Sequence, residues 1–170
     1  MAMDFELRDV READLDLLLQ LNARCEPNVG RIDLERLRWF CDVASYFKVA
    51  DGADGLLAFL IALAPSAPYQ SPNFLWFKER YDDFLYIDRV AVVEAARRGG
   101  VGRAIYADVD RFALAQHGRL TCEVNTRPRN EVSLVFHQRL GFETVGSQET
   151  EGGTKTVAML MKPLNASDRR

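Results

Sequence analysis

Apolar residues recur along the chain with two periods, one typical of strands and the other of helices. Alternating or continuous apolar runs predict seven strands, at residues 5–8, 46–50, 56–63, 84–93, 120–125, 142–147 and 156–161. Apolar stripes at helical spacing predict four helices, at residues 12–25, 34–44, 101–116 and 131–140. The pattern therefore indicates a mixed α/β protein in which strands outnumber helices.

Two segments in the middle of the chain stand apart from this alternation. Residues 84–93 are apolar on both faces except for Asp88 and Arg89, which is typical of a central strand. Residues 65–83 contain three prolines and five aromatic side chains, so we expect a loop there that folds over another part of the protein.

Length and composition narrow the class of protein. The chain has 170 residues, of which 48% are hydrophobic and 28% charged, as in an ordinary globular protein. We expect a single domain over residues 1–164, followed by a polar tail at 165–170. The net charge of −3 indicates neither a broad nucleic-acid footprint nor a basic membrane-binding surface.

The cysteines and the amino-terminal residues bear on location. Cys25, Cys41 and Cys122 are an odd number of widely spaced thiols, and we expect all three to be reduced and buried in a cytoplasmic protein. The amino terminus has no pattern of a secretion signal, and no apolar run is long enough to cross a bilayer. With two histidines in the chain, we expect no catalytic metal site.

The segment between the strand at 84–93 and the helix at 101–116 carries the clearest chemistry. It comprises Arg97, Arg98, Gly99, Gly100, Val101, Gly102 and Arg103. Glycines at the start of a helix allow backbone N–H groups to converge on an anion, and the arginines add positive charge. The segment lacks the Gly-Lys-Ser/Thr that ends a P-loop. It also lacks the third glycine of the dinucleotide-binding motif, because Ile105 stands at that position. Taken alone, it fits a phosphate site and a solvated basic turn equally well.

The order of elements, with Arg97-x-x-Gly100-x-Gly102 after the fourth strand, resembles the GNAT (Gcn5-related) N-acetyltransferase superfamily. A second segment, Asn125 to Phe142, is similar to the family's second cofactor segment, in which a helix ends in a Gly-Phe step. The resemblance covers nearly the whole chain. It implies a central, twisted, mixed and mostly antiparallel sheet of about seven strands with about four helices, splayed between strands 4 and 5.

The resemblance also implies acetyl-CoA as the cofactor and assigns residues to it. The main chain of Val90, Ala91 and Val92 would bind the pantetheine arm, and the turn at 97–103 would bind the pyrophosphate. Asn125, Asn130, Ser133 and His137 belong to the second segment. Arg119 and Arg129 could reach the 3′-phosphate of the cofactor. Both residues are explained better as ordinary surface arginines.

Transfer of an acetyl group to an amine needs a base, because an alkylammonium has a pKa of roughly 10 and must lose a proton before its nitrogen attacks. Tyr86 and Asp88 share one face of their strand, and the resemblance implies a base at one of these two places. Asp88 is the candidate base. A salt bridge with a neighbouring arginine explains it equally well.

The departing thiolate needs an acid, and here the chain departs from the family. His137 stands where the family usually has a tyrosine, four residues before Gly141. Imidazole donates a proton only when it is charged, so His137 is either the acid or a helix residue without a catalytic role. Tyr86 and Tyr106 are alternative proton donors.

The acceptor would lie beneath the aromatic segment, where Asn73, Trp76 and Phe77 are candidate substrate-binding residues. The same aromatic side chains fit a subunit interface, which leaves a homodimer open.

These observations predict an N-acetyltransferase that acts on a primary amine of a small molecule or peptide. Two other functions stay open. One is a non-catalytic module that binds acetyl-CoA or CoA, and the other is a phosphate- or nucleotide-binding domain, which the missing phosphate-loop endings disfavour.

Overall fold

A computed structural model describes residues 3–165, which form two compact units. The described part of the first unit comprises residues 3–63 and 87–110, and that of the second comprises 64–86 and 111–165. The expectation of a single domain stays a prediction. Apart from Asn165, the predicted polar tail lies outside the described residues.

The strands and helices confirm the predicted fold class. The strands are β1 (Phe5–Asp9), β2 (Tyr46–Gly52), β3 (Gly55–Leu63), β4 (Leu85–Val92), β5 (Arg119–Arg127), β6 (Glu143–Thr150) and β7 (Lys155–Pro163). The helices are α1 (Leu15–Arg24), α2 (Leu34–Val43), α3 (Pro72–Lys78), α4 (Val101–Leu114) and α5 (Glu131–Arg139). The seven strands form one mixed sheet in the order β1-β2-β3-β4-β5-β7-β6.

The register between β4 and β5 is parallel, whereas those of β1–β2, β2–β3, β5–β7 and β6–β7 are antiparallel. The parallel partners are Leu85 with Leu120 and Tyr86 with Thr121, at the beginning of each strand. This pairing places Tyr86, a fully buried side chain, next to the strand that carries Glu123.

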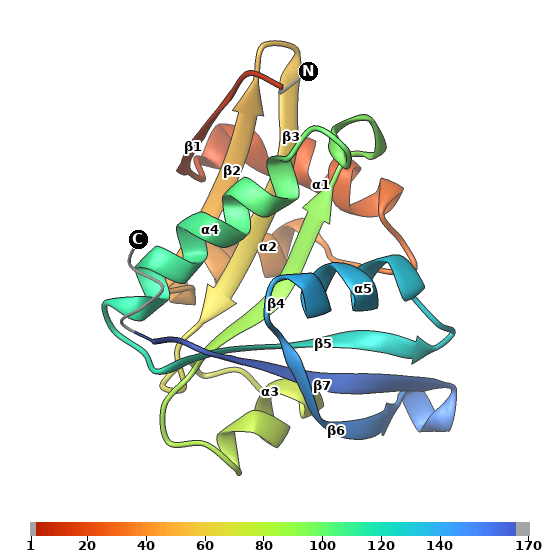
Figure 1. The fold of residues 1–170 in the computed structure, drawn as a ribbon. Helices are drawn as coiled ribbons and strands as arrows, with labels where there is room; N and C mark the ends of the chain where they lie inside the picture. The colour runs from red at the N-terminus through yellow and green to blue at the C-terminus, as the bar shows by residue number, and fades with distance from the viewer. Residues whose placement is uncertain (1–2, 166–170) are drawn as a thin grey trace. The chain divides into compact units, whose positions relative to one another are not determined.

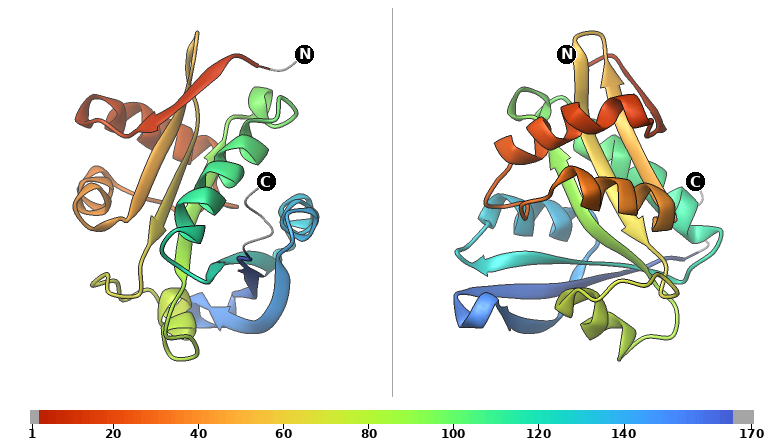
Figure 2. Two further views of the ribbon diagram at one scale, coloured as in Figure 1. Left: turned by 60° about the vertical axis from the view of Figure 1, so that its left-hand side comes forward. Right: turned by 180° about the vertical axis from the view of Figure 1, so that it is seen from behind.

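In the first unit, α1 and α2 cover one face of the β1–β3 strands and α4 covers the other (Figures 1 and 2). Both faces of β2 and β3 are buried beneath these helices. Neighbouring residues along a strand point to opposite faces, so each face has its own set of buried side chains. Ala50 and Ala58 are register partners that pack with Val101 of α4. Val49 and Phe59, the next pair, are fully buried and belong to the opposite face.

In the second unit, α5 and α3 lie on opposite sides of β5, β7 and β6 (Figure 1). Alternation along β5 gives Cys122 and Val124 to one face and Glu123 to the other. The register places Met159 opposite Glu123 and Val157 opposite Gln148, so Glu123 and Gln148 share a face. This is the face on which α3 lies.

Helix α3 corrects the sequence interpretation, which treated residues 65–83 as a loop. Pro72 is the first helical residue, a position where its missing N–H costs no hydrogen bond. Phe74 and Phe77, three residues apart, then bury one side of the helix completely. The prolines that suggested a loop therefore include the residue that begins the helix.

The cysteines follow the sequence expectation in part. Cys25 and Cys122 are buried, and all three thiols are free, but Cys41 is exposed. Helix α2 buries a narrow stripe formed by Leu37 and Phe40, and Cys41 lies outside it. Among residues 3–165, no helix combines the length and apolar character needed to cross a bilayer.

Candidate functional site

The turn before α4 has the backbone shape that the glycines predict. Gly100 has a positive φ of 82°, and a Cβ atom placed on it would meet no other atom within 4 Å. Arg97, Arg98 and Arg103 are exposed around this point. Because the first N–H groups of a helix have no partner within it, the start of α4 offers donors together with positive charge.

The carboxyl end of β4 leads into this turn. Val90 and Val92 are partly exposed and Ala91 is buried. The Val92 carbonyl accepts a hydrogen bond from Arg97 Nε at 3.2 Å and a weaker one from the Cys25 thiol at 3.7 Å. Arg97 is therefore also a residue that ties the turn to the strand before it.

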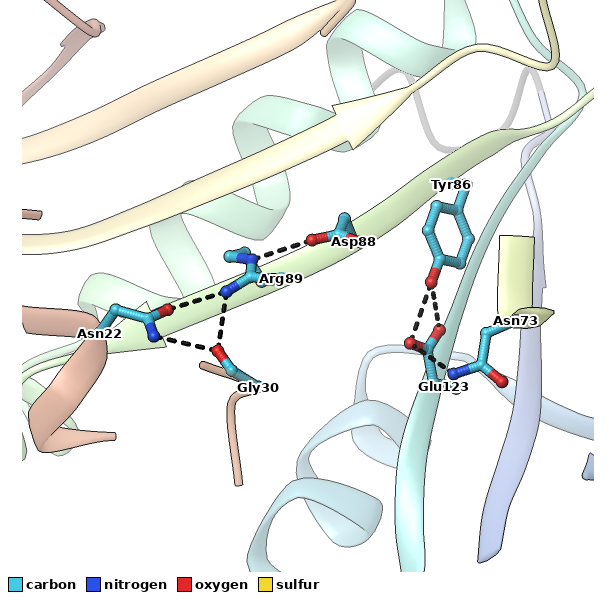
Figure 3. A network of polar contacts seen from close by, with 7 residues as sticks. All are labelled: Asn22, Gly30, Asn73, Tyr86, Asp88, Arg89 and Glu123. Atoms are coloured by element: carbon cyan, nitrogen blue, oxygen red, sulfur yellow. Dashed lines mark hydrogen bonds and ion pairs between the residues drawn. The ribbon is translucent and has the colours of Figure 1, made fainter. Parts of the chain in front are cut away.

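Asp88 is held in an ion pair. Its Oδ2 lies 2.9 Å from Arg89 Nε, and the Asp88 side chain is only 5% exposed (Figure 3). Arg89 Nη1 also donates to Asn22 Oδ1 at 3.1 Å and to the Gly30 carbonyl at 2.8 Å. Asn22 Nδ2 donates to the same carbonyl at 3.0 Å. The arginine thus anchors the connection between α1 and α2 to β4.

Tyr86 takes part in a second polar cluster, in the other unit. Its hydroxyl donates to both carboxylate oxygens of Glu123, at 2.9 and 2.8 Å (Figure 3). Asn73 Nδ2 donates to Glu123 Oε1 at 3.1 Å, and Gln148 Nε2 donates to Asn73 Oδ1 at 2.9 Å. Side chains from β4 and α3 therefore contact one carboxylate of β5, and a β6 side chain contacts the α3 asparagine.

Glu123 is a residue that sequence reasoning missed. It is half-buried on a strand whose neighbours Cys122 and Val124 are buried. The one signal in the sequence was a glutamate within the apolar run Leu-Thr-Cys-Glu-Val, where a charged side chain needs a partner. Its partners come from segments 37 and 50 residues away, so the sequence does not reveal them.

The three predicted substrate-binding residues have different surroundings. Asn73 belongs to the Glu123 cluster. Phe77 is fully buried, with its ring centroid 5.9 Å from that of Tyr86, so it belongs to the core. Trp76 is half-buried, and the guanidinium of Arg80 lies 3.8 Å from its ring centroid.

The α5 segment has the capping that the sequence predicts. Asn130 Oδ1 accepts from the Ser133 N–H at 3.2 Å, and the helix ends before Gly141. His137 is 3% exposed, and its Nδ1 lies 2.7 Å from the Ser133 carbonyl oxygen. Burial lowers the pKa of His137, while the bond to Ser133 opposes part of that shift. The neutral form is therefore favoured, with its proton on Nδ1.

The two arginines considered for the 3′-phosphate have partners within the protein, and the alternative proton donor Tyr106 is buried. Arg119 donates to the Asp83 carbonyl at 3.0 Å, and Arg129 pairs with Glu131 at 2.5 Å. Tyr106 is 1% exposed. Within residues 3–165, no group of three or more His, Cys, Asp or Glu side chains is arranged to bind a metal.

A pocket lies in another part of the second unit. A pocket of about 650 Å³ lies between α5 and the β6–β7 hairpin, with Leu134, Ala158 and Leu160 among its lining residues. Ala158 and Leu160 point to the face opposite Glu123, because they alternate with Met159 along β7. This pocket is therefore separate from the Glu123 cluster.

A comparison with family models decides the family. The model of the acetyltransferase (GNAT) domain matches residues 77–163, just over half of the chain. The chain belongs to the GNAT acetyltransferase family. The matched region contains Tyr86, Asp88, the turn at 97–103, Glu123 and His137, whereas Asn73 precedes it.

Solved structures confirm the GNAT fold. The ribosomal-protein-S18-alanine N-acetyltransferase of Escherichia coli is 14% identical, with 95% of each chain covered and a TM-score of 0.71. Naa20 of Chaetomium thermophilum, solved with a bisubstrate analogue, is 21% identical over 94% of this chain and 86% of that one, with a TM-score of 0.73. A phosphinothricin acetyltransferase of Sinorhizobium meliloti, solved with AcCoA, is 18% identical over 96% and 90%, with a TM-score of 0.70.

At these identities the likeness shows the fold alone. A search of curated protein sequences found no significant match to this chain.

Proposed function

We propose that this protein transfers the acetyl group of acetyl-CoA directly to a primary amine of a small molecule or a peptide. The observation that carries the proposal is the open, positively charged amino terminus of α4, within a chain that belongs to the GNAT family. Each of the three structural neighbours named above is an acetyltransferase by name or is solved with a bisubstrate analogue.

The residues of the turn at 97–103 fit the diphosphate of acetyl-CoA. Gly100 presents no side chain, the N–H groups at the start of α4 are donors, and three exposed arginines supply positive charge. Val90, Ala91 and Val92 offer the strand-like main chain that the pantetheine amides need. When bound, acetyl-CoA supplies the activated thioester carbonyl that an amine nitrogen attacks.

The amine must first lose a proton, and we assign its removal to Glu123. Its carboxylate is half-buried and is oriented by two side chains, Tyr86 and Asn73. Asp88, the base predicted from the sequence, stays the alternative. Its Oδ2 is already engaged in the ion pair with Arg89.

Protonation of the departing thiolate is assigned to His137 or Tyr86. Tyr86 carries a hydroxyl proton that it directs at Glu123. His137 has to be charged to donate from Nε2, and its lowered pKa makes that form scarce at neutral pH. Positioning of the reactants supplies much of the rate in either case.

The free thiols support a reducing location such as the cytoplasm. The homodimer stays a proposal, which light scattering of the purified protein tests.

The test is a transfer assay with acetyl-CoA and three primary amines: 2-phenylethylamine, putrescine and a hexapeptide that begins with alanine. Thiol release and the mass increase of the amine are followed together. We expect at least one amine to gain a single acetyl group. Calorimetric binding of acetyl-CoA without transfer to any primary amine would favour the non-catalytic binding module, and absence of both would overturn the proposal.

A further inference from the structure

The hydrogen bonds around Glu123 have one possible direction. An ionised carboxylate only accepts hydrogen bonds, so Asn73 must turn its NH₂ group toward Glu123 and its oxygen away. That oxygen then needs a donor, and Gln148 provides its NH₂ group. The negative charge of Glu123 thus sets the orientation of two amides in succession.

We propose that Asn73 and Gln148 are positioning residues, which hold the Glu123 carboxylate in place for the acceptor amine. Gln148 acts through Asn73, and Asn73 acts on Glu123 directly. This inference rests on the proposed function, because it gives Glu123 the task of receiving the proton of the amine. It extends the site to the edge strand β6, which nothing in the sequence connected with chemistry.

A purely structural role for this pair would duplicate another contact. Helix α3 and strand β6 are already joined by the Trp76 ring, which lies directly against Gly146. The polar pair lies beside that contact, and both Asn73 and Gln148 are half-buried. Buried amides are costly unless their hydrogen bonds are satisfied, so a Trp–Gly contact alone would be the simpler way to join the two elements.

The groups that face Glu123 within the second unit come from three other elements. The Tyr86 hydroxyl faces it from β4, uncharged Asn73 faces it from α3, and β7 places Met159 opposite it. The Cys122 thiol is its neighbour along β5, and burial first and then the Glu123 carboxylate raise the pKa of that thiol. A carboxylate introduced at position 148 or 73 would add a negative charge to this cluster.

The decisive variant is Gln148→Glu, which keeps the shape of the side chain but loses its NH₂ donor. Asn73 can bond to the new carboxylate only by donating, which turns its oxygen toward Glu123. We expect kcat/KM for the best amine of the panel to fall about tenfold, since about 1.4 kcal/mol of orientation is lost. The acid limb of the pH profile should move up by about half a unit, because a nearby negative charge favours the protonated form of Glu123.

Ser147→Asp is the matched control. It adds the same charge one residue earlier on β6, at an exposed position on the opposite face. We expect its pH profile to match that of the wild type. Calorimetry should give the same acetyl-CoA affinity for both variants and the wild type.

Asn73→Asp is the second variant and decides the matter where Gln148→Glu does not fold. Its new carboxylate still accepts from Gln148 but repels Glu123, so the acid limb should move further up. Superimposed pH profiles of wild type, Gln148→Glu and Asn73→Asp would overturn the inference and leave the proposed function intact. Failure of the proposed function is seen separately, as absence of transfer by the wild-type protein.

Discussion

Trp76 of α3 and Gly146 of β6 are in such close contact that no side chain fits between them. A Cβ atom on Gly146 would lie 2.8 Å from Trp76 Cη2 and even nearer to Cζ2. Gly146 follows an irregularity in the β6–β7 register, between Thr144 and Gly146. The glycine gives the indole its place on this face of the sheet.

Gly146→Ala should therefore destabilise the protein, by roughly 1–3 kcal/mol, because the added methyl group displaces a ring that Arg80 also covers. Urea unfolding followed by tryptophan fluorescence measures the change. Gly30→Ala is the control, since a Cβ there has no neighbour within 4 Å. Equal midpoints for the two variants would contradict the close contact.

At the turn, Gly100→Asp should weaken acetyl-CoA binding by about tenfold or more, because it adds a negative charge where the diphosphate is proposed to bind. Gly100→Asn is the control: asparagine tolerates a positive φ and adds a similar side chain without the charge. Isothermal calorimetry compares the two. If both variants bind acetyl-CoA as the wild type does, the diphosphate is not held at this turn.

The two carboxylates can be separated by Glu123→Gln and Asp88→Asn. We expect the first to lower kcat by about 10²–10³-fold, within the range for loss of a general base, with partial recovery at high pH, where the free amine is abundant. The second should change kcat less than about tenfold, because Arg89 keeps its bonds to Asn22 and Gly30. The reverse order in steady-state kinetics would make Asp88 the base.

His137 offers a comparison between two replacements. If it protonates the thiolate, His137→Phe should lower turnover by roughly 10–100-fold, and His137→Tyr should retain or raise it. Because burial lowers the pKa of His137, its contribution should decline as the pH rises toward neutrality. His137 packs edge-on against Phe136 and Phe142, so thermal melts are compared to separate an effect on packing from one on turnover. Identical rates for all three forms would assign His137 to packing.

Asp14 should make the stability depend on pH. Its hydrogen bonds with Arg8, at 2.8 and 2.9 Å, lower the pKa of the carboxyl, and burial opposes part of this effect. A lowered pKa in the folded state stabilises the protein above about pH 4, and the gain is lost as the pH falls below that value.

Asp14→Asn should therefore cost roughly 2–3 kcal/mol at pH 7 and less at pH 3, as measured by urea unfolding. Asp9→Asn, at an exposed position on β1, is the control and should change the stability little at either pH. A difference between Asp14→Asn and wild type that does not shrink in acid would show that the ion pair is not its cause.

Local signals in the sequence were enough for most of the fold. Asp33 caps α2 through its bond to the Arg36 N–H, and Asn130 caps α5, because these caps involve neighbours three residues away. The apolar stripe of α4 and the central position of β4 were predicted for the same reason. Helix α3 was missed because it is short and because Pro72, its first residue, was interpreted as a sign of a loop.

The candidate site could be predicted only where it consists of consecutive residues, as in the turn at 97–103. The Glu123 cluster joins positions 73, 86, 123 and 148, each on a different element. Only strand register and helix placement bring such side chains together, and no local pattern encodes them. The partner of Asp88 was foreseen as an arginine because Arg89 is its neighbour in sequence.

The unequal exposure of the three cysteines provides a natural attachment point for a spectroscopic probe. Cys25 and Cys122 are buried, so a thiol-reactive dye should attach to Cys41 alone, without any substitution. Partial burial, followed by the charges of Glu12 and Asp42, raises the pKa of the Cys41 thiol, which makes labelling faster under mildly alkaline conditions. A dye placed there lies on α2, and its emission would report on the surroundings of this helix in the unmodified sequence.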